Sequence, residues 1–183
     1  NGDEGKLMQL CQLFALASSP DNNVQQQVMT NLTSAAQLPD FNLYLVTIFA
    51  KMTNQEEVVR QRAGLLLKTN LSRGLSAAAW TPAIAEYIQA QTLAAVRDAN
   101  QVIRHTAGTV ITTLVEKVGV TSCCQTLNQL AGYLGDANPD IVEGAFSALN
   151  KICEDGVTTL KQFWEAAPAE TQPFVSWCTD RLL

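Results

Sequence analysis

Hydrophobic residues between positions 55 and 73 recur at the spacing of an α-helix. The pattern predicts a helix over 55–73 whose apolar stripe consists of Val59, Ala63, Leu66 and Leu67. On the opposite side it places Arg60, Gln61, Gly64 and Lys68. Acidic residues in the first turn, and a basic residue followed by glycine at the end, suit the dipole and the C-cap of such a helix. One helix cannot bury this stripe alone, so the pattern requires neighbouring helices.

Similar helices recur along the chain at regular intervals. Four of them open with an apolar residue and then a charged or amide residue, at Val24-Gln25, Val59-Arg60, Ile103-Arg104 and Val142-Glu143. The spacings between these openings are 35, 44 and 39 residues. Periods of this size are typical of helical solenoids, and here they favour helix pairs of the HEAT or armadillo type. We therefore predict an all-α fold, a right-handed α-solenoid of about four helix pairs plus one extra helix.

Turn residues divide the chain into these pairs. The predicted helices cover about 3–17, 21–37, 40–52, 55–73, 82–95, 101–117, 121–134, 140–154 and 168–183. They group into repeats at about 3–37, 40–73, 80–118 and 121–155, with the start of a fifth at 168–183. The expected N-caps are Asp21, Asp40, Thr81, and either Thr121 or Ser122.

Residues 157–168 look less regular than the rest of the chain. The helix at 168–183 carries several large apolar residues with nothing after it to cover them. Because a solenoid needs a polar outer face at its ends, we interpret residues 1–183 as one segment of a longer solenoid, and we expect that its exposed end can pair two copies. In an alternative reading, 157–168 folds back as the cap.

Composition narrows the class of protein. Hydrophobic residues make up 47% of the 183 residues, which is enough for a buried core. The net charge of −5 disfavours nucleic acid as the main partner, because phosphates need a basic surface. There is no run of about 18 apolar residues, so no membrane span is expected.

Chemical motifs give no sign of a catalytic or metal site. The sequence contains neither a GxSxG nor an HExxH motif, and it has no glycine-rich phosphate loop, so we expect no enzyme and no cofactor. His105 is the only histidine, and it is predicted to be a surface or packing residue. The five cysteines lack CxxC spacing and are interpreted as reduced core thiols; a redox-active Cys123–Cys124 pair is the less favoured alternative, and a zinc site less favoured still.

Polar residues recur at matching places in the four aligned helices. The first row is Gln25, Arg60, Arg104 and Glu143, for which two interpretations are open. The row could form a ladder that bonds neighbouring turns, including Asp98 and Asp136, or it could present charge to a partner. One turn later come Met29, Gly64, Gly108 and Ser147, where small residues would allow close helix packing. Two turns later come Thr33, Lys68, Thr112 and Lys151, predicted to face the groove.

Several stretches resemble a known family. GLLLKTNL (64–71), VIRHTAGTVITTLVEKVG (102–119) and EGAFSALNKICED (143–155), together with PDFNLYL (39–45), are similar to the N-terminal region of transportin-type receptors in the importin-beta (karyopherin-beta) family. The resemblance runs from about residue 7 to residue 155. One departure is Thr69, since the family pattern has asparagine directly after the lysine.

The resemblance implies a nuclear import receptor built from HEAT repeats that shuttles between cytoplasm and nucleus through the nuclear pore. The second helices of the first repeats would bind the small GTPase Ran in its GTP form, which releases cargo. In the full-length protein, cargo and phenylalanine-glycine nucleoporins would be further partners. Repeat position and resemblance together select five candidate Ran contacts: Lys68, Arg104, Thr112, Glu143 and Lys151. The alternative is a HEAT scaffold that assembles other proteins without binding Ran.

Overall fold

The computed structural model describes residues 2–74 and 80–166. The described residues form α1 (Gly2–Leu16), α2 (Asn22–Ala35), α3 (Phe41–Ala50), α4 (Glu57–Arg73), α5 (Pro82–Ala95), α6 (Gln101–Val118), α7 (Val120–Gly132), the 3-10 helix η1 (Tyr133–Gly135), α8 (Pro139–Asp155) and α9 (Val157–Ala166). No strand occurs in these two ranges, so the all-α prediction is confirmed. The predicted helix at 168–183 lies outside the described residues.

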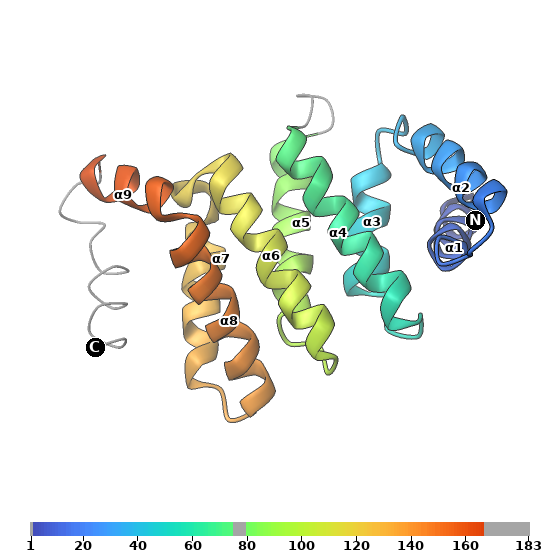
Figure 1. Cartoon of the computed structure of the whole chain (residues 1–183). Helices are drawn as coiled ribbons and strands as arrows, with labels where there is room; N and C mark the ends of the chain where they lie inside the picture. The colour runs from blue at the N-terminus through green and yellow to red at the C-terminus, as the bar shows by residue number, and fades with distance from the viewer. Residues whose placement is uncertain (1, 75–79, 167–183) are drawn as a thin grey trace.

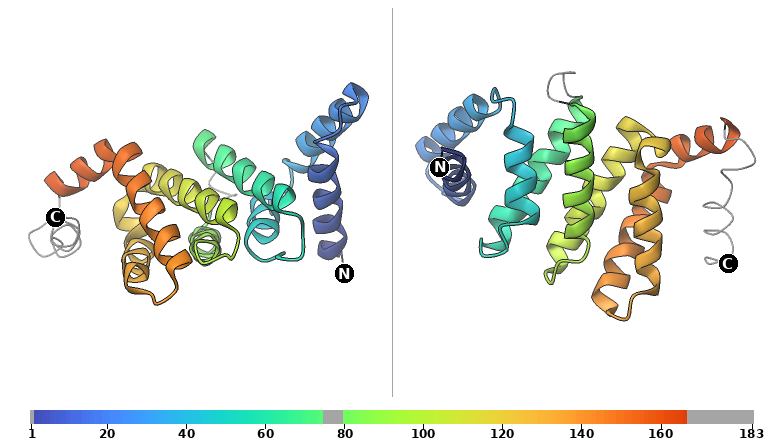
Figure 2. Two further views of the ribbon diagram at one scale, coloured as in Figure 1. Left: turned by 60° about the horizontal axis from the view of Figure 1, so that its bottom comes forward. Right: turned by 180° about the vertical axis from the view of Figure 1, so that it is seen from behind.

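The helices stack in two layers. α4, α6 and α8 lie side by side in one layer, and α3, α5 and α7 lie behind them in the other (Figures 1 and 2). We call these the second-helix layer and the first-helix layer, after the order of the helices within each pair. Packing between successive helices of a layer and between the layers produces the elongated arrangement of an α-solenoid.

The first pair departs from this arrangement. α2 packs against α1, and the helix of this pair that packs against α4 is α1 (Figure 1). The reason lies at the eighth residue after each N-cap. α4 and α6 have Gly64 and Gly108 there, whereas α2 has Met29, which is 69% exposed. A long side chain at this position is incompatible with the close stacking that the two glycines allow.

The glycine contacts show how close that stacking is. A Cβ added to Gly64 would lie 2.8 Å from atoms of Phe49 and Thr106, and one added to Gly108 would lie 3.0 Å from the Cα of Ala148. The prediction that small residues here serve helix packing is therefore confirmed for both glycines. It also corrects the prediction that Gly64 lies opposite the apolar stripe: α4 is covered on two sides, by α3 and by α6.

Helix ends follow the predicted capping in part. The side chains of Asp21 and Thr81 cap α2 and α5 by accepting hydrogen bonds from backbone N–H groups. Asp40 precedes α3 but makes no such hydrogen bond. The prediction that Thr121 or Ser122 caps the next helix is wrong. α7 already begins at Val120, because Gly119 has a φ of 86°, which turns the chain without further linker residues.

A helix also follows Gly156, where the sequence looked irregular. The N–H of Gly156 donates to the carbonyl of Ile152 (2.8 Å), and its own carbonyl accepts from the N–H of Leu160 (2.9 Å). The glycine therefore ends α8 and starts α9 without an intervening loop. Among the described residues, no helix is long and apolar enough to cross a membrane.

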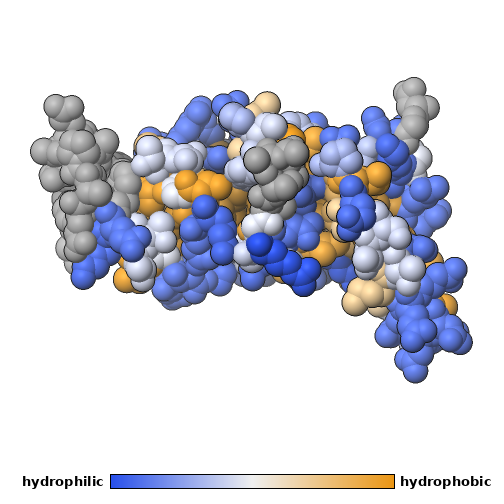
Figure 3. Space-filling view, turned by 90° about the horizontal axis from the view of Figure 1, so that it is seen from above, coloured by the Kyte–Doolittle hydropathy of each residue, from blue (hydrophilic) through white to orange (hydrophobic). Residues whose placement is uncertain are grey.

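The core lies between the two layers. Its largest fully buried side chains come from both layers and include Phe49, Leu45, Ile48, Leu67, Ile88, Ile103 and Ile111. On the face seen in Figure 3, apolar surface forms separate patches between hydrophilic residues. The core thus fixes the second helices side by side and sets which of their polar residues reach the surface.

Candidate functional site

Counting from the N-caps gives the true register of the second-helix layer. Arg60 and Arg104 are both the fourth residue after their N-caps, but the fourth residue of α8 is Val142. Glu143 is therefore one residue out of the register that the sequence predicted. The predicted alignment matched Val142 with Ile103, whereas Ile141 is the buried residue that corresponds to Ile103.

Arg60 joins three parts of the fold from a buried position. The residue is 4% exposed. Its Nε donates to the carbonyl of Phe49 (3.0 Å), and its Nη1 and Nη2 donate to the two carboxylate oxygens of Asp98 (3.3 and 2.5 Å). Because Asp98 lies in the turn between α5 and α6, this fork ties α4 to the next repeat.

Arg104 makes the equivalent link one repeat later. The residue is also 4% exposed. Its Nε donates to Glu143 (3.0 Å), its Nη2 to Asp140 (3.3 Å), and its Nη1 to the carbonyls of Asp98 and Ala99 (both 3.0 Å). The predicted ladder is therefore present for both arginines.

Two predicted members of the ladder lie elsewhere. Asp136 accepts from the backbone N–H of Asn138, and its predicted place beside Arg104 is taken by Asp140 and Glu143. Gln25 donates to the carbonyl of Ser19 within the first pair. These side chains stay local because α2 does not stack on α4, and because Glu143 is one residue further along α8 than predicted.

The five candidate contacts differ in accessibility. Arg104 is fully engaged inside the protein. Thr112 is 3% exposed and donates to the carbonyl of Gly108 (2.9 Å), since α6 has neighbours on both sides in its layer. Lys68 is partly exposed and has no hydrogen-bond or ion-pair partner within residues 2–74 and 80–166. Lys151 is 39% exposed at its side chain and pairs with Asp155 (2.8 Å).

Glu143 connects the buried ladder with the surface. Its carboxylate accepts from Arg104 on one oxygen, and its other oxygen lies 2.6 Å from Nε2 of His105. Partial burial alone raises the pKa of Glu143, but hydrogen bonds from His105 and Arg104 outweigh this effect and hold the pKa below its ordinary value. The sequence did not predict the contact with His105, although both residues are fifth after their N-caps.

This pKa gives a prediction for stability against pH. Because the folded pKa of Glu143 lies below its ordinary value of 4.5, its carboxylate stabilises the fold fully above that pH. The contribution is lost as the pH falls through the folded pKa. Urea unfolding of Glu143→Gln at a series of pH values should therefore show a weaker loss of stability below pH 4.5 than the unsubstituted chain. Glu116→Gln, at an exposed glutamate of α6, should keep the original dependence; equal curves for both variants would contradict the assignment.

Apolar side chains add to the surface of the second-helix layer. Leu65 of α4 is 42% exposed and Phe146 of α8 is 53% exposed. Together with Lys68, Glu143 and Lys151 they give this layer an accessible surface of mixed polar and apolar character. Within the described residues, no group of three or more His, Cys, Asp or Glu side chains could hold a metal ion.

Comparison with known proteins shows to which protein family this helical chain is similar. Residues 28–98 match the family model described as the importin-beta N-terminal domain. Transportin-1 of Homo sapiens is 34% identical over 158 residues, and transportin-1 of Oryza sativa subsp. japonica is 37% identical over 153 residues; these alignments cover 86% and 84% of the chain. Importin subunit beta-2 of Schizosaccharomyces pombe is 32% identical over 158 residues, or 86% of the chain. The chain belongs to the transportin group of the importin-beta family.

The similarity to these transportin-group proteins covers most of this chain but only a small part of the length of each relative. The chain spans 17% of the length of each of these three proteins. Residues 66–167 also match the family model described as non-SMC mitotic condensation complex subunit 1, so the segment from α4 to α9 shares the sequence pattern of that family too.

The departure at Thr69 from the importin-beta pattern changes little in the packing. The hydroxyl of Thr69 donates to the carbonyl of Leu65 within α4 (2.9 Å). Asn70, one residue later, donates to the side chain of Asn42 in α3 (2.9 Å). The asparagine in this chain therefore ties the two helices of the second pair together.

Cysteine positions correct one further prediction. Cys11 and Cys123 are buried thiols, as predicted, whereas Cys124 and Cys153 are exposed. Burial raises the pKa of Cys123 to about 12, so this thiol stays protonated and unreactive at neutral pH. Cys178 lies outside the described residues. All four described cysteines are free thiols.

Proposed function

We propose that this chain is the N-terminal part of a nuclear import receptor of the transportin type, and that it binds GTP-loaded Ran through the second-helix layer. The observation that carries the proposal is similarity to transportin-1 over 86% of the chain, on a fold that presents α4, α6 and α8 side by side. Ran binding would release cargo elsewhere in the receptor.

The accessible residues of the layer define the proposed contact. Lys68 has no ion-pair partner among the described residues, and Glu143 and Lys151 are partly exposed. Arg104 and Thr112 would support this surface from below, since their side chains are buried. The buried ladder holds Glu143 in place, so the charged groups are positioned before a partner arrives.

In the full-length receptor, cargo and phenylalanine-glycine nucleoporins complete the proposed set of partners. A receptor with these partners would shuttle between cytoplasm and nucleus through the nuclear pore. The proposed repeats are 3–37, 40–73, 80–118 and 121–155. The proposed fifth repeat and the self-association of its exposed end concern residues outside those that the structure describes.

A second candidate function is a scaffold that assembles other proteins without binding Ran. The match of residues 66–167 to a subunit of a condensation complex supports this candidate. The two functions differ in nucleotide dependence. A transport receptor binds Ran loaded with GTP more tightly than Ran loaded with GDP, whereas a scaffold binds neither form.

The test measures binding of Ran in both nucleotide states by calorimetry. The double variant Lys68→Glu, Lys151→Glu should weaken binding of the GTP form by about tenfold or more. Each change replaces a cation with a carboxylate on the proposed contact surface and would repel a partner group that the lysine attracts. Arg97→Glu makes one such charge reversal on the first-helix layer and should leave binding unaltered. Equal weakening by both variants would remove these lysines from the site, and no binding of either form would remove the receptor function.

A further inference from the structure

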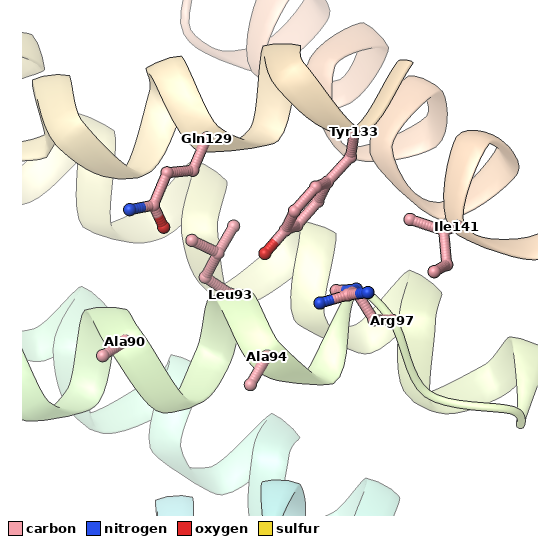
Figure 4. Close-up of a pocket in the computed structure, with 7 residues that line it drawn as sticks. All are labelled: Ala90, Leu93, Ala94, Arg97, Gln129, Tyr133 and Ile141. Carbon is pink, nitrogen blue, oxygen red and sulfur yellow. The ribbon is translucent and has the colours of Figure 1, made fainter. Parts of the chain in front are cut away.

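We propose that the groove between α5 and α7 is a docking site for a peptide in which an acidic side chain follows an apolar one. The groove has a volume of about 330 Å³ and opens on the first-helix layer (Figure 4). It lies apart from the proposed Ran surface, so the inference does not depend on that function. Three properties of the lining residues identify the ligand.

The first property is an apolar floor with room above it. Leu93 and Ile141 are 4% and 7% exposed and are the most buried side chains of the lining, so we call them the floor. Ala90 and Ala94 come from successive turns of α5, and their small side chains leave space on the α5 side of the groove. This space suits an aliphatic side chain such as leucine, which would bury its methyl groups against the floor.

The second property is a set of polar groups that the protein itself does not use. Gln129 and Tyr133 extend from the opposite wall toward α5, and Arg97 lies beside the hydroxyl end of Tyr133 (Figure 4). Within the part of the chain that the structure describes, none of these three side chains has a hydrogen-bond or ion-pair partner. The guanidinium carbon of Arg97 lies 5.3 Å from the centre of the Tyr133 ring. Stacking of this kind orients the guanidinium and leaves its N–H groups available.

The third property is charge. Arg97 is the only ionisable group with a positive charge among the lining residues, and the lining contains no carboxylate. By contrast, the buried Arg60 and Arg104 are both paired with carboxylates. A carboxylate ligand would give Arg97 the ion-pair partner that no described residue supplies, with additional hydrogen bonds from the Tyr133 hydroxyl and the Gln129 amide.

The neighbouring groove along the same layer is lined differently. Its lining residues come from α1, from the turn before α3, and from α3 and α5, and they include Asp3 and Asp40 and no cation. Lys6 lies beside this groove but pairs with Asp3. The groove between α5 and α7, which has Arg97 in its lining, is therefore the better match for a carboxylate ligand.

Two small probes test the inference on the full chain. The acetylated, amidated dipeptide leucyl-aspartate carries the proposed motif, and leucyl-asparagine is its neutral counterpart of the same shape. In an NMR titration, the aspartate probe should shift the signals of Gln129, Tyr133 and Ala90 and bind at millimolar concentrations, as expected for so small a ligand. The asparagine probe should bind about tenfold more weakly, because it lacks the charge-assisted hydrogen bonds.

Variants separate the proposed site from general charge effects. Arg97→Gln should abolish the preference for the aspartate probe, whereas Lys117→Gln removes the same charge from an exposed residue of α6 and should preserve it. Ala94→Glu places a competing carboxylate one turn from Arg97 and should block the aspartate probe. Equal affinity of the two probes, or equal effects of Arg97→Gln and Lys117→Gln, would overturn the proposal. The proposal would also be overturned if a neutral phenylalanyl-glycine probe bound more tightly than the aspartate probe in all variants. The groove would then recognise an aromatic ring without any need for a carboxylate.

Discussion

Replacing Arg60 with alanine should lower the free energy of unfolding by about 3–5 kcal/mol, because it leaves a buried carboxylate without its partner. The side chain of Asp98 is only 10% exposed, so water cannot replace the two N–H groups that it loses. The carbonyl of Phe49 loses the hydrogen bond from Nε as well. Urea unfolding followed by circular dichroism measures the change.

The exposed ion pair between Lys151 and Asp155 supplies the control. It also joins two oppositely charged side chains, but these are 39% and 46% exposed. Lys151→Ala should therefore change the free energy of unfolding by about 0–1 kcal/mol. A loss of less than about 1 kcal/mol in Arg60→Ala would show that water enters the site, and it would remove the ladder as the link between repeats.

Replacing Gly144 with alanine should destabilise the fold by about 1–3 kcal/mol through overpacking. A Cβ at this position would lie 2.6 Å from the carbonyl oxygen of Val96 and 3.0 Å from Cδ of Arg104. The backbone oxygen cannot rotate away as a side chain could, so α8 must shift away from the turn that it contacts. The same shift would strain the hydrogen bonds of Arg104. Thermal and urea unfolding of Gly144→Ala test this expectation.

Gly132 provides a matched substitution in a neighbouring helix. Nothing lies within 4 Å of a Cβ added there, and its φ of −59° is helical. Gly132→Ala should therefore leave stability unchanged or raise it by up to about 1 kcal/mol, since alanine loses less backbone entropy than glycine on folding. Similar losses in the two variants would mean that helix propensity, and not the approach of α8 to α6, decides the outcome at Gly144.

The close helix packing at the glycines and the ion pairs of the two buried arginines depend on each other. Gly64 and Gly108 let each second helix approach the next, and Arg60 and Arg104 then reach across to the following repeat. At the eighth position α8 has Phe146 in place of glycine, and this side chain is 53% exposed. Within the described residues, α4 and α6 therefore have glycine at the eighth position and stack closely on the next second helix, whereas α2 and α8 have the large side chains Met29 and Phe146 there.

The sequence by itself determined the all-α class, the period of the repeats and most helix positions. These depend on local interactions: apolar spacing within one helix, and caps such as Asp21 and Thr81 that bond to their own first turn. The polar ladder was predictable as well, because arginines at Arg60 and Arg104 recur at one repeat position.

Only the tertiary structure decided which polar residues remain accessible. Thr112 was predicted to face the groove and Arg104 was a candidate partner contact, but neighbours on both sides of α6 bury both side chains. The shift of Glu143 by one residue, its contact with His105, and the convergence of Arg97, Gln129 and Tyr133 all join residues from different helices. The physical reason is that periodicity describes one face of one helix, whereas burial depends on how closely its neighbours approach.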